Sequence, residues 1–402
     1  MPAKYSVGID IAKEKFQVNF TVLEETRKTT IKGSRQFDNI TSGFGDFVRW
    51  VEKREKDSEA ETVFVMEATG TYHEQLAWFL HNQNRKVCLM LANRAKALMT
   101  GMGQKSKNDP ADAAGLAKIG ALHELKEWRP VSKSCYKLRG LTRHHESLHS
   151  TKTALNNQKH ALRYGMIPLP DVLKGLDSVL VAVEKQLKEC ESSICKLILE
   201  DEELARKTKL VTSIKGVGIM TAAILIAETD GFALFRSVRQ LVSYAGYNVR
   251  ENQSGKRSGK TRITKKGNAH IRRILFLPAF NAVTWDVGNF GQLYRRVYGK
   301  TGIKMKAYVA VQSKLLKVIF SLWKNDKVYD SEFHKTSGYQ EPKPLFSGGA
   351  EGDRQDGQDR NGQHEDGKKE IAVPAGSATL DGLPCDQSPE ALFSGATNIE
   401  KI

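Results

Sequence analysis

The sequence lacks any apolar run that approaches the ~20 residues of a membrane-spanning helix. Its first residues, Met1-Pro-Ala-Lys-Tyr, do not contain the apolar core of a signal peptide. The 5 cysteines are odd in number and show no metal-ligand spacing, which is typical of reduced thiols. These absences predict a cytoplasmic protein that has no membrane partner, no disulfide framework and no cysteine-ligated zinc.

A nucleotide-binding P-loop is also missing. Ser258-Gly-Lys-Thr resembles the end of that motif, but the glycine needed five residues before Gly259 is Ser254. No buried strand leads into the segment either. The sequence therefore excludes a P-loop ATPase.

Acidic residues are few relative to basic ones, except near the C-terminus. The formal net charge is +16, although Glu341 to Ile402 holds 6 Lys/Arg and 12 Asp/Glu, so the rest of the chain is more basic still. Such a charge predicts a polyanionic partner, namely nucleic acid. Residues 326–402 form a tail rich in Gly, Asp, Gln and Pro, which we predict to be largely disordered.

Four acids in the first third of the chain are its most informative residues: Asp10, Glu67, Asp109 and Asp112. The first two lie in or at the end of apolar, strand-like runs, and the last two are three residues apart, so they share one face of a helix. A carboxylate at the end of a buried strand is costly unless it is paired or bound to metal. Four together favour an oxygen cage for two Mg²⁺ ions, which clamp the reacting oxygens of a phosphodiester. The pattern predicts an enzyme that cuts or joins nucleic acid.

Each acid alone also has a structural explanation. An Asp at a strand end is commonly a turn former. Asp109 before Pro110 is a good helix N-cap, and Asp112 then favours the helix dipole. The two explanations are compatible, because a capped helix would hold both carboxylates in place for a metal.

Residues 1–130 alternate strand-like and helix-like runs, which predicts an α/β domain with helices over Phe44–Lys53, His73–Asn82 and Pro110–Leu122. Residues 131–210 instead carry heptads: leucines recur every seven residues from Leu141 to Leu162, and a 3-4 spacing follows from Leu173 to Leu197. A short Pro/Gly break separates the runs. This predicts an antiparallel coiled-coil hairpin and a homo-oligomer, dimer or tetramer; the alternative is helix packing within one monomer.

Residues 211–325 are predicted to be mostly helical and to bind DNA. Ile214-Lys-Gly-Val-Gly resembles a helix-hairpin-helix, in which Lys215, Gly216 and Gly218 would contact a phosphate at a helix N-terminus; the alternative is a glycine turn before a buried helix. From Arg250 to Arg273 there are nine Lys/Arg and one acid, with glycines interleaved, which suits phosphate contacts but also fits a solvated face. The predicted contacts here are Lys256, Arg257, Lys260, Arg262, Lys265, Lys266, Arg272 and Arg273.

Two serines in this region directly precede a glycine. Ser254 and Ser258 are candidate nucleophiles, but a serine in a Ser-Gly turn is more often structural. A nucleophilic serine also needs an activating base or Lewis acid, which the sequence alone does not display.

Several motifs together resemble one family. Gly8-Ile-Asp-Ile-Ala, Met66-Glu-Ala-Thr-Gly and Lys107-Asn-Asp-Pro-Ala-Asp-Ala are similar, in order and spacing, to the acidic signature of IS110-family transposases, which belong with Piv-type DNA invertases. The second half resembles that family's C-terminal domain through four segments: Ile214-Lys-Gly-Val-Gly, Ala245-Gly-Tyr, Ser254-Gly and Ile263-Thr-Lys-Lys-Gly-Asn-Ala-His-Ile-Arg-Arg. The resemblance covers residues 5–325.

The resemblance implies a RuvC-like (RNase H) fold for the N-terminal domain, with a DEDD tetrad at the four acids. It implies a C-terminal serine that becomes covalently linked to DNA, and the distance upstream of Ile263 matches Ser254 rather than Ser258. Asn108 replaces the threonine that the family typically carries before its last two acids. IS110-type elements also encode a structured guide RNA, so RNA is an implied partner beside DNA and Mg²⁺.

Three other functions remain open. A RuvC-like Holliday-junction nuclease would use water and need no serine. A site-specific DNA invertase would share every residue named above. A non-catalytic nucleic-acid-binding protein is the third, and the intact tetrad argues against it.

Overall fold

The computed structural model describes residues 2–68, 70–104, 108–251, 253–254, 257–259 and 261–332 of the chain. They fall into two units that divide between Val131 and Ser132. The tail predicted to be disordered lies, from residue 333 onward, outside the described residues. None of the described helices is both long enough and apolar enough to span a bilayer.

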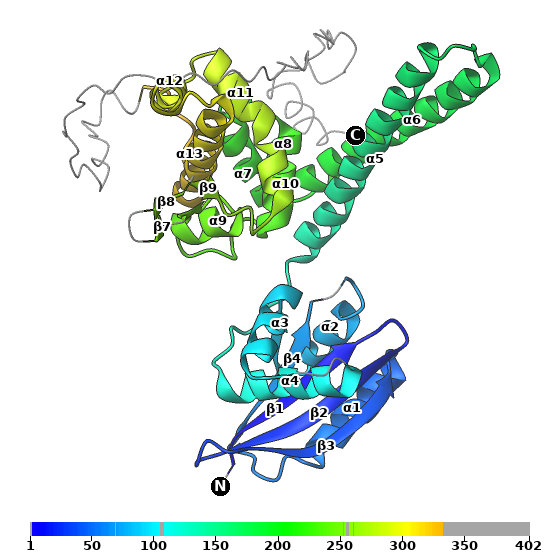
Figure 1. The fold of residues 1–402 in the computed structure, drawn as a ribbon, viewed down its shortest axis with the longest axis vertical. Coiled ribbons are helices and arrows are strands. Elements are labelled where there is room, and N and C mark those ends of the chain that lie inside the picture. The colour runs from blue at the N-terminus through cyan, green and yellow to red at the C-terminus, as the bar shows by residue number, and fades with distance from the viewer. Residues whose placement is uncertain are drawn as a thin grey trace, which may run out of the picture. The chain divides into compact units, whose positions relative to one another are not determined.

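The N-terminal unit is built on a five-stranded mixed sheet of order β3-β2-β1-β4-β5. Three strands form an antiparallel meander, β1 (Pro2–Ile11), β2 (Lys15–Glu24) and β3 (Thr29–Asp38). The other two, β4 (Glu61–Glu67) and β5 (Lys86–Met90), extend the sheet parallel to β1 (Figure 1). The predicted α/β class of this domain is therefore confirmed.

Helices cover both faces of the sheet. One apolar cluster joins Ile9 and Phe64 to α1 (Thr41–Glu52) and α2 (Glu74–Asn82). Another joins Val63 and Val65, on the opposite face, to α3 (Ala92–Gly101) and α4 (Asp109–Leu122). The three helices expected from the sequence correspond to α1, α2 and α4.

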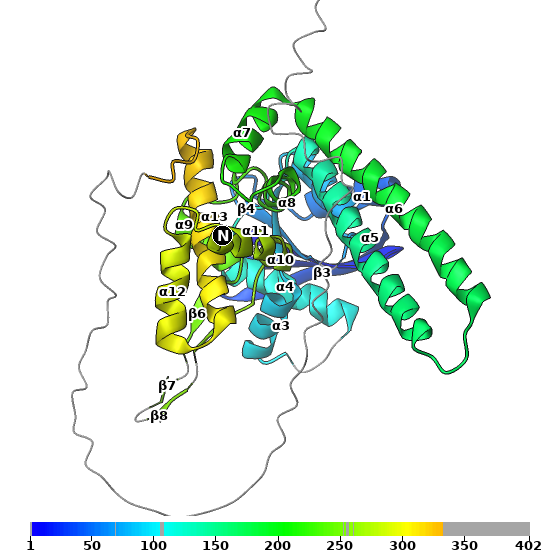
Figure 2. The same ribbon diagram turned by 90° about the horizontal axis from the view of Figure 1, so that it is seen from above.

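The second unit begins with two long helices, α5 (Lys133–Arg163) and α6 (Pro170–Leu199), which reverse direction and pack along each other (Figure 2). Their contacts are antiparallel: Lys152 Nζ lies 2.9 Å from Glu184 Oε1, and Lys159 pairs with Asp177. The two helices thus form an antiparallel hairpin, and the predicted coiled-coil packing stays a prediction. Leu180 and Leu187 are buried within the single chain, so the heptads do not by themselves require a second copy, and self-association stays a prediction.

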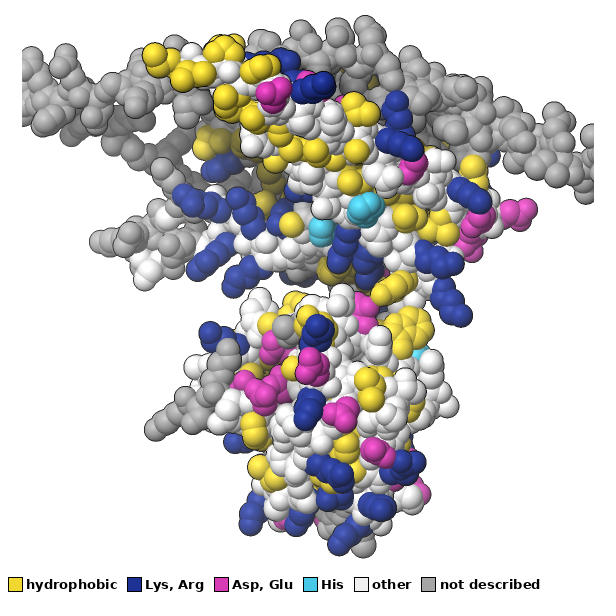
Figure 3. Space-filling view, turned by 90° about the vertical axis from the view of Figure 1, so that its right-hand side faces the viewer, with side chains coloured by type: hydrophobic (Ala, Val, Ile, Leu, Met, Phe, Trp, Pro, Cys, Tyr) yellow, Lys and Arg dark blue, Asp and Glu magenta, His cyan; other side chains and the backbone are white. Residues whose placement is uncertain are grey.

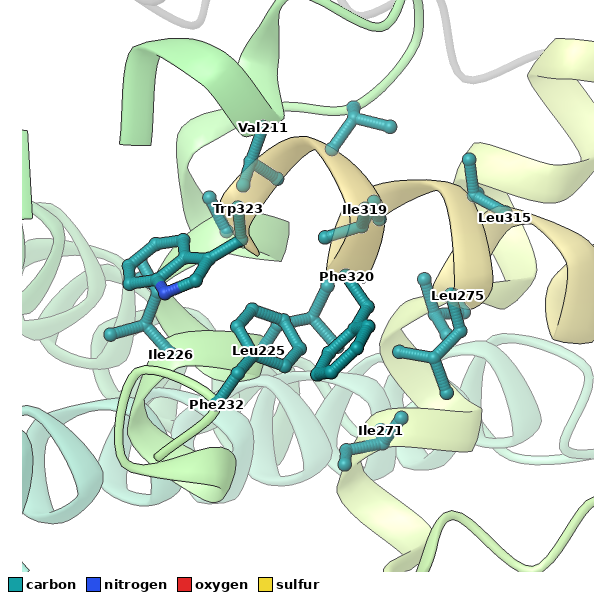
Figure 4. Packing of buried hydrophobic residues seen from close by; sticks show 14 of the residues in the cluster. Val211, Leu225, Ile226, Phe232, Ile271, Leu275, Leu315, Ile319, Phe320 and Trp323 are labelled. Carbon is teal, nitrogen blue, oxygen red and sulfur yellow. The ribbon is translucent and has the colours of Figure 1, made fainter. Parts of the chain in front are cut away.

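In the described part of this unit, shorter helices follow: α7 (Glu202–Thr212), α8 (Ile219–Thr229), α9 (Val238–Tyr244), α10 (Ala269–Ile274), α11 (Phe276–Thr284), α12 (Phe290–Thr301) and α13 (Lys304–Asn325). The helix α8 is apolar over most of its circumference and forms the centre of the core, as expected for a fully buried helix. Figure 4 shows Leu225 and Ile226 packed near Phe232, Phe320 and Trp323.

The base of the hairpin belongs to the same core. Cys135 and Leu138 of α5 and Ile194 and Ile198 of α6 are buried in the cluster that contains α8 and α13. The segments 131–210 and 211–325, which the sequence separates by pattern, therefore share one core.

Candidate active site

Asp10 and Glu67 lie at the same level of two adjacent parallel strands. The pairing of β1 with β4 places Ile9 opposite Met66, so Asp10 and Glu67 follow in register. Neighbouring strands are ~4.8 Å apart, and residues two apart on a strand share a face. Asp10 therefore shares a face with Gly8, and Glu67 shares that face with Val65.

The helix α4 covers this face and approaches β1 very closely. A Cβ atom at Gly8 would overlap the backbone of Ala113 and Ala117, so only glycine fits there. A Cβ at Gly120, further along α4, would overlap the side chain of Ser6. Because Gly120 meets Ser6 and Ala113 meets Gly8, α4 runs antiparallel to β1.

This crossing brings the start of α4 toward Asp10. Two strand residues, from Ser6 to Gly8, span ~6.6 Å, and a helix covers the same distance in roughly four to five residues at ~1.5 Å each. Two more residues along β1 lead from Gly8 to Asp10. The same distance along α4, from the region that contacts Gly8 toward the helix N-terminus, leads to the first turn of α4. That turn contains Asp109 and Asp112. The four acids therefore lie toward the carboxyl ends of β1 and β4, although no three of their carboxylates come within 4.8 Å of one another in the described structure.

The N-cap of α4 is Asn108 and not Asp109, which corrects the capping role considered from the sequence. The Asn108 side chain accepts a hydrogen bond of 2.9 Å from the Ala111 backbone N–H. The carboxylates of Asp109 and Asp112 are therefore both in the first helical turn, where the dipole favours negative charge. Gln104 Nε2 also donates to Asp112 Oδ1 over 2.8 Å, which holds that side chain in place.

The acids are open to solvent. Asp10, Glu67 and Asp112 are half-buried and Asp109 is exposed. Figure 3 shows acidic side chains gathered on one part of the N-terminal unit and many Lys and Arg side chains on the visible face of the other unit. Carboxylate oxygens are the ligands that Mg²⁺ prefers, so the chemistry of these residues fits a hard divalent cation.

Ser254 lies in the C-terminal unit, near the tip of a thin ribbon. Val249 pairs with Ile263 between β6 (Val249–Arg250) and β9 (Arg262–Ile263). Further out, β7 (Gln253–Ser254) pairs with β8 (Arg257–Ser258). The strands β7 and β8 stand away from the helices of this unit (Figure 2).

The pairing of β7 with β8 separates the two serines. Ser254 is opposite Arg257, whereas Ser258 is opposite Gln253. The Ser254 side chain is exposed. Lys256 and Lys260, and the side chains of Arg257 and Ser258, lie outside the described residues.

The glycine loop before α8 lies at the surface. Lys215 and Gly218 are exposed, and Gly218 is the N-cap of α8. Gly216 has φ +91° and packs against Trp285, and the Lys215 ammonium lies 5.4 Å from the centre of that indole ring. The described structure thus places a helix N-terminus at the surface, and the predicted phosphate contact stays a prediction.

The predicted basic residues separate into two groups. Arg262, Lys265, Lys266 and Arg273 are exposed. Arg272 instead donates hydrogen bonds to the carbonyls of Ala245, over 2.7 Å, and Asn268, over 3.1 Å. The Arg272 guanidinium therefore stabilises the turn that follows α9, and its predicted contact with DNA stays a prediction.

A groove adds basic residues that the sequence did not single out. Its volume is about 1280 Å³, and Arg262 and Lys265 line it together with four bases of α12 and α13: Arg296, Lys306, Lys314 and Lys317. These four are separated by three to ten residues on helices, so they form no charge run. Only a helical-face count of Lys and Arg could have found them.

The buried carboxylate of Glu228 connects the helices that adjoin the basic segment from Arg250 to Arg273. Glu228 of α8 is 1% exposed, and it accepts from Arg143 Nε over 2.8 Å and from Asn268 Nδ2 over 2.6 Å. Burial acts to raise the pKa of Glu228, but the hydrogen bonds from Arg143 and Asn268 outweigh it, so the pKa is lowered. The ionised carboxylate joins α5, α8 and α10.

Several known proteins are similar in sequence to this chain. A model described as "Transposase" matches residues 7–167, and one described as "Transposase IS116/IS110/IS902 family" matches residues 208–295. The "Pilin gene-inverting protein" of Moraxella bovis is 27% identical over 336 residues, which are 83% of this chain and 100% of that protein. The "Insertion element IS110 uncharacterized 43.6 kDa protein" of Streptomyces coelicolor is 29% identical over 161 residues, 40% of this chain and 38% of that one.

One solved structure is also similar in part. RuvC of Thermus thermophilus is 12% identical, with a TM-score of 0.24, and the match covers 30% of this chain and 98% of RuvC. The family assignment comes from the sequence: the two matched ranges together span more than half of the 402 residues and contain all four acids and Ser254. The chain belongs to the IS110 family of transposases.

Proposed function

We propose that this transposase exchanges DNA strands at an acidic metal site, with Ser254 as the nucleophile. The observation that supports the proposal is the register of β1, β4 and α4, which directs the four acids toward one edge of the sheet. Asp10, Glu67, Asp109 and Asp112 would hold Mg²⁺, which supplies Lewis-acid stabilisation of charge on a scissile phosphate. Invertase and transposase are two outcomes of the same strand exchange.

The serine step balances as a transesterification. The Ser254 Oγ forms a bond to phosphorus and loses its proton, while the bond from phosphorus to the 3′-oxygen breaks and that oxygen gains a proton. The released 3′-hydroxyl of one strand then attacks the phosphoserine of its partner: this oxygen loses its proton and bonds to phosphorus, the bond from phosphorus to Ser254 Oγ breaks, and the serine regains a proton. Because each step exchanges one phosphoester for another, strands join without an external energy source. The exposed position of Ser254, opposite Arg257, suits an approach by a phosphate.

We further propose that the basic groove holds nucleic-acid phosphates, either of DNA or of an element-encoded guide RNA. Arg262, Lys265, Lys314 and Lys317 line it, and the groove wall also contains apolar side chains. Neutralising phosphates with Lys and Arg releases counterions, so binding through this groove should weaken steeply with salt.

The test of the serine uses full-length protein, Mg²⁺ and end-labelled DNA that carries the ends of the element. We expect a protein–DNA adduct that survives denaturant, disappears in Ser254→Ala and persists in Ser258→Ala. Ser254→Cys is expected to retain part of the activity, because a thiolate is also a nucleophile.

Two outcomes would contradict the proposal. Cleaved ends without any adduct would instead support a RuvC-like nuclease that uses water. An adduct that is lost in Ser258→Ala and not in Ser254→Ala would transfer the role to Ser258. Sequencing the noncoding DNA beside the gene would supply the element ends for the substrate.

A further inference from the structure

Two histidines of α5 and one glutamate of α6 form a cluster that the proposed DNA chemistry does not use. His145 and His149 are four residues apart, so their side chains share one face of α5. Glu191 reaches them from α6. One nitrogen of each imidazole and one carboxylate oxygen lie within 4.8 Å of one another. Among the described residues, this is the group of three His, Cys, Asp or Glu side chains that meets this spacing.

The cluster is ordered by direct contacts. His145 Nε2 lies 3.0 Å from Glu191 Oε1, and the rings of His145 and His149 are 4.6 Å apart at 69°. His145 is buried, Glu191 is half-buried and His149 is exposed. A groove of about 640 Å³ is lined by both histidines, so the cluster can be reached from solvent.

A simpler explanation is a hydrogen bond between His145 and Glu191 that ties the two helices together. That explanation accounts for the imidazole of His145. It gives no role to the edge-on contact between the rings of His145 and His149. Lys152, three residues after His149 on α5, is paired with Glu184 at 2.9 Å.

We propose that His145, His149 and Glu191 bind a borderline divalent metal ion, best matched by Zn²⁺, which clips α5 to α6 at the base of the hairpin. Two imidazole nitrogens and one carboxylate oxygen suit Zn²⁺, whereas Mg²⁺ prefers oxygen ligands alone. Bonds of ~2.0–2.2 Å place tetrahedral ligands ~3.4 Å apart, so modest side-chain rotation closes the present spacing. The groove leaves the fourth position open to water.

Such an ion would act on the hairpin as a whole. It would join residues 46 apart in sequence, His145 and Glu191, at a point where α5 also packs on α8. The same groove is lined by Ile224 of α8 and Ile274 of α10. The ion would therefore fix the direction in which the hairpin leaves the helical core. The proposal is independent of the acidic site and of Ser254.

The experiment uses the full-length protein, stripped of metal with a chelator and titrated calorimetrically with Zn²⁺ in excess Mg²⁺. We expect one Zn²⁺ per chain at this site and a melting temperature that rises with Zn²⁺, because the ion binds only the folded hairpin. Loss of an outer-shell partner typically weakens metal sites ~10–100-fold, so removing a ligand should cost at least about 100-fold. His149→Ala and Glu191→Gln should each show that loss.

His144→Ala is the matched control, because His144 is exposed and adjacent in α5 but outside the cluster. It should retain both Zn²⁺ binding and the rise in melting temperature, as should Asp10→Asn. Circular dichroism checks that every variant is folded, and since His149 is exposed, its replacement should not unfold α5. Absence of stoichiometric Zn²⁺ binding, or binding unchanged in His149→Ala, would overturn the proposal.

Discussion

Gly8 of β1 lies directly under the backbone of Ala113 in α4, and this contact leaves no space for a side chain. Asp10 is two residues further along β1, and Asp112 is the residue before Ala113. The close approach of strand and helix is therefore the relationship that brings carboxylates from distant parts of the sequence to one edge.

Gly8→Val is expected to separate the acids without removing any of them. The added side chain must displace α4, at a cost of ~1–3 kcal/mol for overpacking, and recombination should fall to background. Gly45→Ala in α1 is the control, since a Cβ there meets nothing within 4 Å. Urea unfolding and a recombination assay measure both effects, and wild-type recombination by Gly8→Val would show that the α4 position is not critical.

Neutral replacements of the acids should abolish recombination and leave the fold and DNA binding largely intact. We expect Asp10→Asn, Glu67→Gln and Asp112→Asn each to lower the rate ~10²-fold or more, because each removes negative charge from the metal site. Asp46→Asn, an exposed acid of α1, should have no effect. Any of the three that recombines at the wild-type rate would not be a metal ligand.

The α6 helix allows a test of self-association. Leu187 is 5% exposed and Val181 is 67% exposed on the same helix. Leu187→Asp should disrupt the hairpin, because a seam position cannot bury an unpaired charge, and should lower the mass measured by light scattering. Val181→Asp should preserve the helicity of α6. A lower mass for this variant would show that the exposed face of α6 contacts a second copy. An unchanged mass in both variants would mean that the hairpin packs only within one chain.

The Glu228 network should make stability depend on pH. Since its pKa in the folded state is below the ordinary value of 4.5, its contribution is complete above pH 4.5 and is lost as the pH falls through the lowered pKa. Glu228→Gln is expected to cost ~1–3 kcal/mol at neutral pH and progressively less below pH 4.5. Urea unfolding at neutral and acidic pH measures this, with the exposed Glu200→Gln as the control. An equal loss at both pH values would contradict the role of the ionised carboxylate.

Sequence patterns predicted much of the local structure. Apolar, strand-like runs predicted the strands that carry Asp10 and Glu67, and the heptads from Leu141 to Leu197, with the Pro/Gly break between them, predicted two helices that reverse direction. These features depend on residues close in sequence. The cap of α4 was assigned one residue late, because Asn108 and Asp109 are both good caps and only the backbone decides between them.

The basic groove and the histidine cluster could not be predicted in the same way. Lys314 and Lys317 are isolated along one helix, and the groove forms only when α13 packs beside β9. His145 and Glu191 belong to helices whose register is set by packing along the whole hairpin. A single sequence does not display that register.

The sequence by itself therefore determined which residue types are present for chemistry: four acids, a serine before a glycine and a basic segment, in the order typical of the IS110 family. Only the tertiary structure decided which of them come together. The physical reason is steric: strand register and the contact between Gly8 and Ala113 orient the carboxylates, and both depend on residues that are far apart in the sequence.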